Sequence, residues 1–267
     1  MPSKDNMSLG DRMKIYYENC SKIVLPRRMP LIIRLDGKAF HTLTRGCEKP
    51  FDMNIIKLMD QTTKYLCKNI QGAVLAYVQS DEISILVHNY KRLTSSAWFD
   101  NELEKIVSIT AGMASAYFTM MYNESVIAYR NHRDILKPCI FDSRVFVLPE
   151  AEVCNYFVWR QQDWERNSIQ MLAQSLYSHK ELQNKNCPNL QEMCFQKGKN
   201  WNDLSVSLKR GRCCIQEQKI IRDNPEDMIP HRNIEDMFYK EWVIDENIPI
   251  FCEDRNYIND LLKIEEE

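Results

Sequence analysis

Short apolar runs alternate with longer amphipathic stretches through the first half of the chain. Four runs rich in aliphatic and β-branched residues, each ended by turn residues or proline, predict strands at 29–34, 73–79, 83–88 and 141–148. Apolar residues recur at helical spacing between Ile55 and Leu66, and Asp52 is placed to cap that helix. A longer stripe of the same period, from Leu103 to Met121, predicts a second helix.

The order of these elements is strand, helix, strand, strand, helix, strand. This order is typical of the split β-α-β arrangement of a ferredoxin-like domain, an α+β fold with an antiparallel sheet and helices on one face. Only Ser80, Asp81 and Glu82 separate the second and third strands, so these strands form a hairpin. The first strand lies beside this hairpin in such a sheet, and Asp36 then approaches Asp81.

The remainder of the chain has a different character. A helical stretch over 150–179 precedes a basic region, and residues 212–220 alternate like a strand. We therefore expect a catalytic domain over 1–149 and a helical and basic C-terminal part over 150–267. The basic residues are either phosphate contacts for a nucleic acid or an ordinary solvated face; they are Lys197, Lys199, Lys209, Arg210 and Arg212.

Composition limits the class of protein. With 44% hydrophobic and 27% charged residues the chain has the make-up of a folded protein, and its net charge of −2 excludes a general polycation but not a local basic face. No stretch approaches the roughly 20 apolar residues of a membrane helix. The polar first residues fit neither a signal nor a transit peptide, so we expect a cytoplasmic protein, with an organelle not excluded. The ten cysteines lack the paired spacing of a zinc site.

Two acidic turns carry the candidate chemistry. Alone, Asp36 before Gly37 is an ordinary turn residue, and so is Asp81 in its hairpin. Together they would repel each other unless a cation lay between them, and hard oxygen ligands suit Mg²⁺. This is the ligand type of two-metal phosphoryl transfer. Gly37 would also let backbone amides approach a phosphate. Polar residues that complete a nucleotide site follow shortly after: Lys38, His41, Lys49 and Asp52.

Several sequence blocks together resemble the tRNA-His guanylyltransferase family. The blocks span roughly residues 10–180, and they are the runs 34–41 (RLDGKAFH), 49–52 (KPFD), 76–84 (AYVQSDEIS), 141–145 (FDSRV) and 156–161 (YFVWRQ), with Trp98, Lys105 and Ser108. The resemblance implies a polymerase-like palm that adds nucleotides to the 5′ end of tRNA in the 3′–5′ direction.

The resemblance also implies the roles of individual residues. Asp36, the Gly37 carbonyl and Asp81 would bind two Mg²⁺ ions, and Glu82 joins the catalytic set, either as a supporting group behind the metal ligands or as a solvated turn residue. GTP and other NTPs would be substrates, and ATP would activate the 5′ end. The nucleotide loop would comprise Asp36, Gly37, Lys38, Ala39, Phe40 and His41, with Lys49, Asp52, Ser80 and Asp81. Lys105, Ser108 and Arg144 would be further contacts to triphosphate or RNA. Family members form tetramers, which implies a homotetramer.

One segment departs from the family pattern. Where eukaryotic members carry H-I-N-N-L-Y-N, this chain has Glu165 to Met171, with an acid in place of the histidine and Met171 in place of an amide. We therefore expect templated repair of 5′-truncated tRNAs. The alternatives are addition of G at position −1 of tRNA-His, a non-catalytic tRNA-binding protein, and a nucleotide cyclase that needs no RNA.

Overall fold

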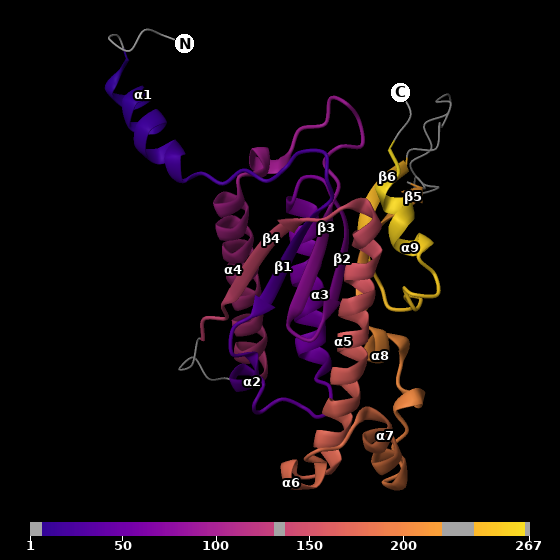
Figure 1. Cartoon of the computed structure of the whole chain (residues 1–267). Coiled ribbons are helices and arrows are strands. Elements are labelled where there is room, and N and C mark those ends of the chain that lie inside the picture. Colours follow the sequence, from indigo (N-terminus) through magenta and orange to yellow (C-terminus); the bar gives the residue numbers. More distant parts are fainter. Residues whose placement is uncertain (1–6, 131–136, 221–237, 265–267) are drawn as a thin grey trace, which may run out of the picture.

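The computed structural model describes residues 7–130, 137–220 and 238–264. Its centre is a six-stranded antiparallel sheet with the strand order β4-β1-β3-β2-β5-β6 (Figure 1). The strands are β1 (Leu31–Gly37), β2 (Ala73–Gln79), β3 (Glu82–Val87), β4 (Phe141–Val147), β5 (Arg212–Ile220) and β6 (Phe238–Asp245). The four strands expected in the first half of the chain are confirmed, and so is the position of the first strand beside the hairpin. β6 was not predicted.

One face of the sheet packs on two helices, α3 (Met53–Asn69) and α4 (Leu103–Arg130). Ile33 and Leu35 of β1 and Ile83 and Ile85 of β3 point to this face, because alternate residues of a strand face the same side. Asp52 accepts hydrogen bonds from the backbone amides of the first turn of α3, so the expected cap is confirmed. A short 3-10 helix, η4 (Trp98–Asn101), leads into α4.

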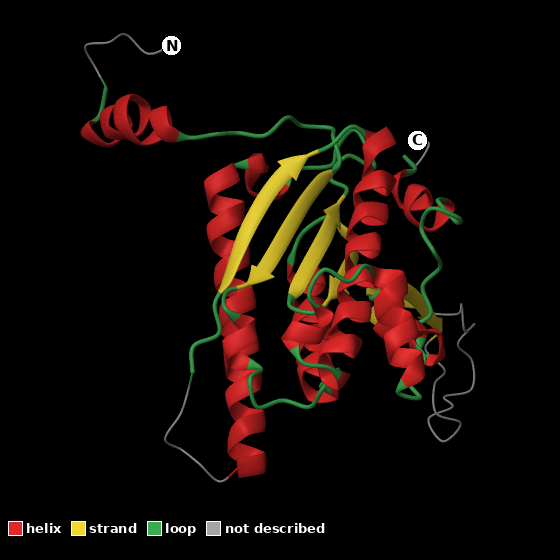
Figure 2. Cartoon of the chain, turned by 60° about the horizontal axis from the view of Figure 1, so that its bottom comes forward, coloured by secondary structure: helices red, strands yellow, loops and turns green. Residues whose placement is uncertain are grey.

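The opposite face is covered as well, which corrects the expectation of helices on one face only. The long helix α5 (Glu150–Leu176) crosses this face, where Val153 and Phe157 pack against Ile32, Leu75 and other residues of the sheet. Figures 1 and 2 show α5 on the side of the sheet away from α3 and α4. α5 and β5 both follow residue 149, so residues on each side of the expected domain boundary build one sheet and its covering layers.

Short helices complete the C-terminal part. A small separate core, which includes Leu172, Leu190 and Trp201, joins the end of α5 to the segment that follows it. The helices here are α6 (His179–Leu182), α7 (Cys187–Gln196), η5 (Trp201–Asp203), α8 (Val206–Arg210), α9 (Asn256–Asn259) and η7 (Asp260–Leu262). In the first half of the chain a short helix, α2 (Phe40–Leu43), follows β1. No helix within the described ranges carries an apolar run long enough to cross a bilayer. The ten cysteines all lie in the described ranges, and none of them forms a disulfide bond.

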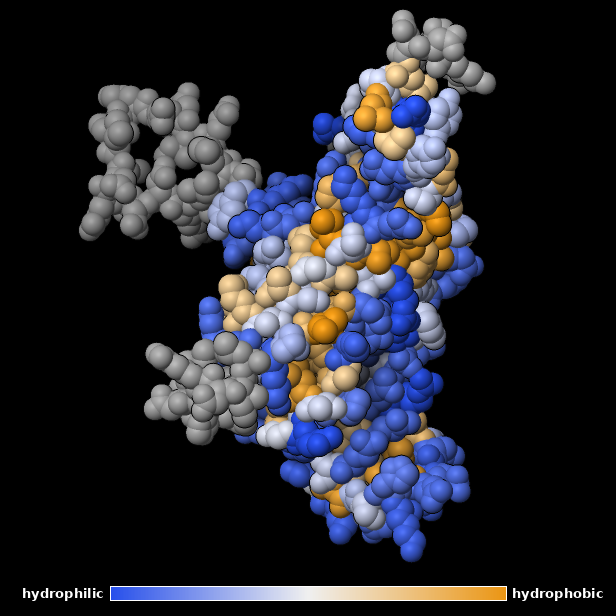
Figure 3. All heavy atoms as spheres, turned by 90° about the vertical axis from the view of Figure 1, so that its left-hand side faces the viewer, coloured by the Kyte–Doolittle hydropathy of each residue, from blue (hydrophilic) through white to orange (hydrophobic). Residues whose placement is uncertain are grey.

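The N-terminal segment stands away from this body. It consists of α1 (Leu9–Met13), a π-helical turn η2 (Lys14–Glu18) and a 3-10 turn η3 (Asn19–Ser21), none of which buries a residue (Figures 1 and 2). Its exposed apolar side chains are Leu9, Met13, Ile15, Tyr16 and Tyr17. Figure 3, which looks at the molecule from this side, shows hydrophobic atoms in patches on a mostly hydrophilic surface.

Candidate active site

The site lies where β1 ends beside the turn between β2 and β3. Asp36 of β1 is opposite Glu82 of β3, and the Gly37 amide donates a hydrogen bond to the Asp81 carbonyl at 3.0 Å. Ser80 adopts a positive φ of 46° within this turn. The two acidic turns therefore meet at one edge of the sheet, as the topology predicted.

The two aspartates of this edge have different surroundings. The side chain of Asp36 is about one-third exposed (36%) and lies 3.9 Å from Arg34. Asp81 is more enclosed. Burial raises the pKa of Asp81, and the charges of Asp36 and Glu82 raise it further, against a hydrogen bond from Ser80. Excess negative charge at this edge favours a bound cation.

The donor set fits magnesium that is shared with a substrate. No group of three or more His, Cys, Asp or Glu side chains in the described part of the chain is arranged to hold a metal by itself. Asp36, Asp81 and the Gly37 carbonyl offer only part of a coordination shell. Mg²⁺ is commonly held by one or two carboxylates and completes its shell with water and substrate phosphates.

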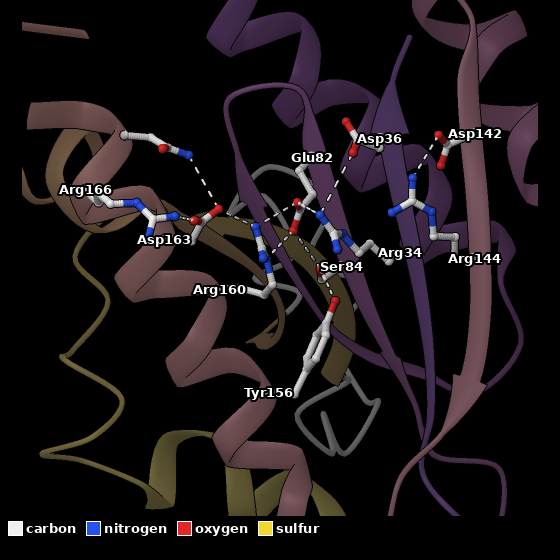
Figure 4. A network of polar contacts seen from close by, with 11 residues as sticks. Arg34, Asp36, Glu82, Ser84, Asp142, Arg144, Tyr156, Arg160, Asp163 and Arg166 are labelled. Atoms are coloured by element: carbon white, nitrogen blue, oxygen red, sulfur yellow. Dashed lines mark hydrogen bonds and ion pairs between the residues drawn. The ribbon is translucent and has the colours of Figure 1, made fainter. Parts of the chain in front are cut away.

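Glu82 is the centre of an ion network (Figure 4). Its carboxylate accepts one hydrogen bond from Arg34 at 2.6 Å and two from Arg160 of α5, at 2.7 and 3.0 Å. Arg160 also donates to Asp163 at 2.7 Å. Glu82 is only 7% exposed, so the alternative of a solvated turn residue is wrong. Its lone pairs are committed to two guanidinium groups, and it acts here as a positioning residue behind Asp81.

The loop after Asp36 is shaped by packing. A Cβ at position 37 would lie 2.3 Å from the ring of Phe40, which is buried between Phe118 and Phe141 and cannot move away. Only glycine therefore fits at this position. The Gly37 and Lys38 amides already donate to the carbonyls of Asp81 and Ile140, so the expectation that Gly37 frees amides for a phosphate is wrong for these two groups. Ala39 has a left-handed conformation and is the N-cap residue that precedes α2.

We call the end of β1 and the β2–β3 turn, which carry Asp36 and Asp81, the acidic edge. A cavity of about 320 Å³, the smaller of two cavities here, opens on one side of it. This volume is at the small end of the range for nucleotide-sized ligands. Of the predicted nucleotide contacts, those that line the cavity are Gly37, Ala39, Phe40, His41, Lys49, Asp52, Ser80 and Asp81. Asp36 and Lys38 do not line it. Phe40 contributes from the core, whereas the side chains of His41 and Lys49 are exposed.

A second, more polar cavity of about 410 Å³ lies between the same edge and α5. We call it the amide cavity, because Gln79, Asn167, Gln170 and Gln174 line it together with Asp36 and Arg160. The three α5 amides follow helical spacing and so share one face of the helix. Ser80, Asp81, Trp164 and Met171 line both cavities, so the acidic edge separates two adjoining spaces.

Lys38 and the three further contacts predicted for triphosphate or RNA, which are Lys105, Ser108 and Arg144, lie outside both cavities. Lys105, on the first turn of α4, lies over the ring of Phe99 at 4.9 Å, and the Ser108 hydroxyl donates to the carbonyl of Lys105. Arg144 of β4 pairs with Asp142 at the surface, one strand away from Asp36. The structure thus brings Arg144 near the acidic edge but leaves Lys105 and Ser108 apart from it.

The basic residues of the C-terminal part divide into two kinds. Lys197 and Lys199 are exposed, and Lys209 donates to the Asn202 carbonyl at 2.7 Å. Arg212, in contrast, is only 2% exposed and pairs with Asp60 of α3 at 2.7 Å. The expectation that Arg212 belongs to an exposed basic face is wrong, because Arg212 is buried at the start of β5, where it lines the smaller cavity.

Sequence reasoning missed Arg34 and Arg160 as members of the site. The sequence did contain one signal for Arg160. It falls on the apolar stripe of α5, between Phe157 and Trp164, and a charged residue in such a position indicates a buried ion pair. The segment that departs from the family pattern also contributes unevenly. Glu165 is exposed and lines neither cavity, whereas Met171 lines both.

Comparison with known proteins agrees with this geometry. The family model described as tRNAHis guanylyltransferase matches residues 10–149. A probable tRNA(His) guanylyltransferase of Drosophila melanogaster is 28% identical over 228 residues, which cover 79% of this chain and 76% of that protein.

Solved structures extend the similarity to nearly the whole chain. A bacterial tRNA(His) guanylyltransferase-like protein in complex with ATP is 43% identical, with a TM-score of 0.81, and the match covers 97% of this chain and 100% of that one. A complex of such a protein with GTP has a TM-score of 0.76 at 42% identity, with 96% and 99% covered. The mixed α/β fold of these proteins is therefore the fold of this chain.

Proposed function

Because the chain belongs to the tRNA(His) guanylyltransferase family, nucleotidyltransferases that act on the 5′ end of tRNA, we propose that its reaction is the templated repair of 5′-truncated tRNAs. The observation that carries the proposal is the position of Asp81, which lines both cavities, beside Asp36, which lines the amide cavity. A polymerase working in the 3′–5′ direction must hold a nucleoside triphosphate and an RNA end on either side of its reacting phosphate. The smaller cavity suits the nucleotide, and the amide cavity suits the RNA end.

The proposed chemistry is one phosphoryl transfer. The 3′-hydroxyl of the incoming nucleotide attacks the activated 5′ phosphorus of the tRNA, a phosphodiester forms, and the hydroxyl proton is released. Pyrophosphate leaves from a 5′-triphosphate end. A 5′-monophosphate end first accepts AMP from ATP, which releases pyrophosphate, and this AMP then leaves in the addition step. Asp36, Asp81 and the Gly37 carbonyl would hold two Mg²⁺ ions, which lower the pKa of the attacking hydroxyl and neutralise the leaving group when bound.

The chain's own residues would bind and orient the reactants. Lys49 and His41 border the smaller cavity with exposed side chains and would contact the triphosphate. Glu82 would hold the hairpin turn rigid through its two arginines. Asp52 is engaged as a helix cap by three backbone amides, so its part would be to fix the loop that carries Lys49.

The preference for templated addition rests on the α5 segment. Met171 supplies no hydrogen-bond donor, and only a weakly accepting thioether sulfur, to the two cavities that it lines. Pairing with the opposite strand would then select the nucleotide, and addition would stop when the acceptor stem is complete. Addition of G at position −1 of tRNA-His is the second candidate, and the family match itself favours it.

We propose a homotetramer as the working assembly. The apolar side chains of the N-terminal segment are not covered by other described residues, and burying them against a second copy would stabilise an oligomer. Light scattering of the full chain measures this directly. A monodisperse monomer at micromolar concentration would contradict it.

One assay tests the proposed reaction. Purified protein is given Mg²⁺, labelled NTPs and two substrates, a tRNA that lacks its first nucleotide and a full-length tRNA-His with A73. We expect faster addition to the truncated tRNA, and only of the NTP that pairs with the opposite base. Faster addition of G to the full-length tRNA would instead support the second candidate. Turnover of GTP without RNA would identify a cyclase, and RNA binding without addition would identify a non-catalytic protein.

A further inference from the structure

An exposed tryptophan stands beside the amide cavity. Trp159 of α5 is 51% exposed, whereas Trp164, little more than a turn later on the same helix, is 3% exposed. The guanidinium carbon of Arg160 lies 4.3 Å from the Trp159 ring centroid, and that of Arg34 lies 5.7 Å away. Both arginines line the amide cavity, and the Trp159 ring, which is not itself part of the lining, lies against these two arginines.

The surroundings of Trp159 hold its ring in place. Both arginines are held by Glu82, whose carboxylate accepts three hydrogen bonds of 2.6 to 3.0 Å from them. The ring of Tyr156 meets that of Trp159 edge-on, with the centroids 5.9 Å apart. These contacts restrict the half-exposed Trp159 ring to one position. The side chain therefore loses little conformational entropy when a ligand covers it.

The ring is also close to the reacting edge. Arg34 contacts the Trp159 ring on one side and lies 3.9 Å from the Asp36 carboxylate on the other. Only the Arg34 side chain would therefore separate a ligand that covers Trp159 from the Asp36 carboxylate. On the proposed function, the group that must sit there is the end of the tRNA acceptor stem.

We propose that Trp159 is a stacking platform for the terminal base pair of the tRNA acceptor stem. The inference rests on the proposed function and names how the RNA end is seated. The end of a duplex presents a flat base-pair face, and stacking on an aromatic ring is tolerant of sequence because every base has such a face. An enzyme that repairs by templating must accept any terminal pair, and an aromatic platform meets that need without reading the bases.

The test compares four proteins on a tRNA lacking its first nucleotide: wild type, Trp159→Ala, Trp159→Phe and the matched control Tyr239→Ala. Tyr239 is 45% exposed on β6, at the edge of the sheet and well away from β1 in the strand order. We expect Trp159→Ala to raise the KM for tRNA roughly 10- to 100-fold and to leave the KM for NTP unchanged. Trp159→Phe should recover most of the loss, and the control should match wild type.

A binding measurement separates this inference from the proposed function. A duplex RNA that mimics the acceptor stem is titrated into each protein without NTP, and the tryptophan fluorescence is followed. We expect quenching in wild type that is reduced in Trp159→Phe, while the unpaired strand of the duplex quenches less. If the duplex quenches but no RNA is extended, the proposed function fails and the inference stands.

Three results would overturn the inference. The first is a KM for tRNA in Trp159→Ala that matches the Tyr239→Ala control. The second is a loss in Trp159→Phe as large as in Trp159→Ala, because any aromatic ring should stack. The third is a change of oligomeric state in Trp159→Ala, which would make this face a contact between copies of the chain.

Discussion

Glu82 and Arg160 form a bidentate ion pair that joins β3 to α5, and the two residues are 78 positions apart in the sequence. The pair is buried, and Arg34 completes it from β1. The buried carboxylate of Glu82 accepts hydrogen bonds from two guanidinium groups and so connects β1, β3 and α5. It does so directly beside Asp81, and the network therefore links stability to the geometry of the acidic edge.

Removing the charge of Glu82 should destabilise the protein strongly. We expect Glu82→Gln to lower the free energy of unfolding by about 3 kcal/mol, because the buried Arg160 and the partly buried Arg34 lose the carboxylate that they share. Urea denaturation measures the change. The control is Asp142→Asn, whose pair with Arg144 is 55% exposed at both side chains and should contribute at most about 1 kcal/mol. Equal stability of the two variants would contradict a structural role for the Glu82 network.

The two aspartates of the acidic edge should behave in the opposite way. We expect Asp36→Asn and Asp81→Asn each to reduce nucleotide addition at least about 1000-fold, since removing a metal ligand takes several kcal/mol of stabilisation from the transition state. Folding should be preserved, because each change relieves repulsion between neighbouring carboxylates. Asp100→Asn, an exposed carboxylate paired with Arg27, is the matched control. Near-normal turnover in both site variants would eliminate the proposed metal ligands.

Local patterns were enough to predict most of the sheet and the meeting of Asp36 with Asp81. Strands such as β2 and β3 are continuous apolar runs, and the two residues between them, Ser80 and Asp81, permit only a hairpin. The acidic edge follows from topology alone, because β1 lies next to β3 in this fold.

The parts that were missed depend on contacts between distant residues. Arg212 was assigned to the surface because nothing nearby in sequence shows its partner Asp60, which lies 152 residues away. Nothing local shows that α5 returns across the open face of the sheet, either. Polar and apolar residues are mixed in β6, which pairs only at the sheet edge, so its pattern was weak.

Lys49 should matter for nucleotide binding and Lys105 should not. Lys49 lines the smaller cavity, whereas Lys105 lies over Phe99, outside both cavities. We expect Lys49→Ala to raise the KM for NTP about 10-fold, because the variant cannot make a charge-assisted hydrogen bond to phosphate. Lys105→Ala serves as the matched variant and should leave this KM unchanged. A larger effect in Lys105→Ala would move the nucleotide away from the smaller cavity.

Asp52 should stabilise the start of α3 in a pH-dependent way. Burial acts to raise its pKa, but hydrogen bonds from the Glu48, Ile55 and Asn54 amides outweigh this and hold the pKa below the usual 3.8. The stabilisation is therefore present above pH 3.8 and is lost as the pH falls through the lower folded-state pKa.

Two variants separate the cap from the charge. We expect Asp52→Ala to lower the free energy of unfolding by about 1 kcal/mol at pH 7 and by less at about pH 3, whereas Asp52→Asn, which still caps, should lose less at pH 7. Urea denaturation at the two pH values checks both expectations. A deficit in Asp52→Ala that grows as the pH falls would contradict the assignment.

The basic residues of the C-terminal part should separate into a binding group and a structural one. Changing the exposed Lys197 and Lys199 to Gln should weaken tRNA binding and lower the slope of log affinity against log salt by about one for each phosphate that is no longer neutralised. The structural member of this set is Arg212.

Burial already raises the pKa of Asp60, and Arg212 opposes that rise. Without Arg212 the carboxyl of Asp60 therefore takes up a proton more readily, and the protein loses stability. We therefore expect a lower melting temperature in Arg212→Gln with the salt slope unchanged. A reduced slope with normal stability would return Arg212 to the RNA-binding face.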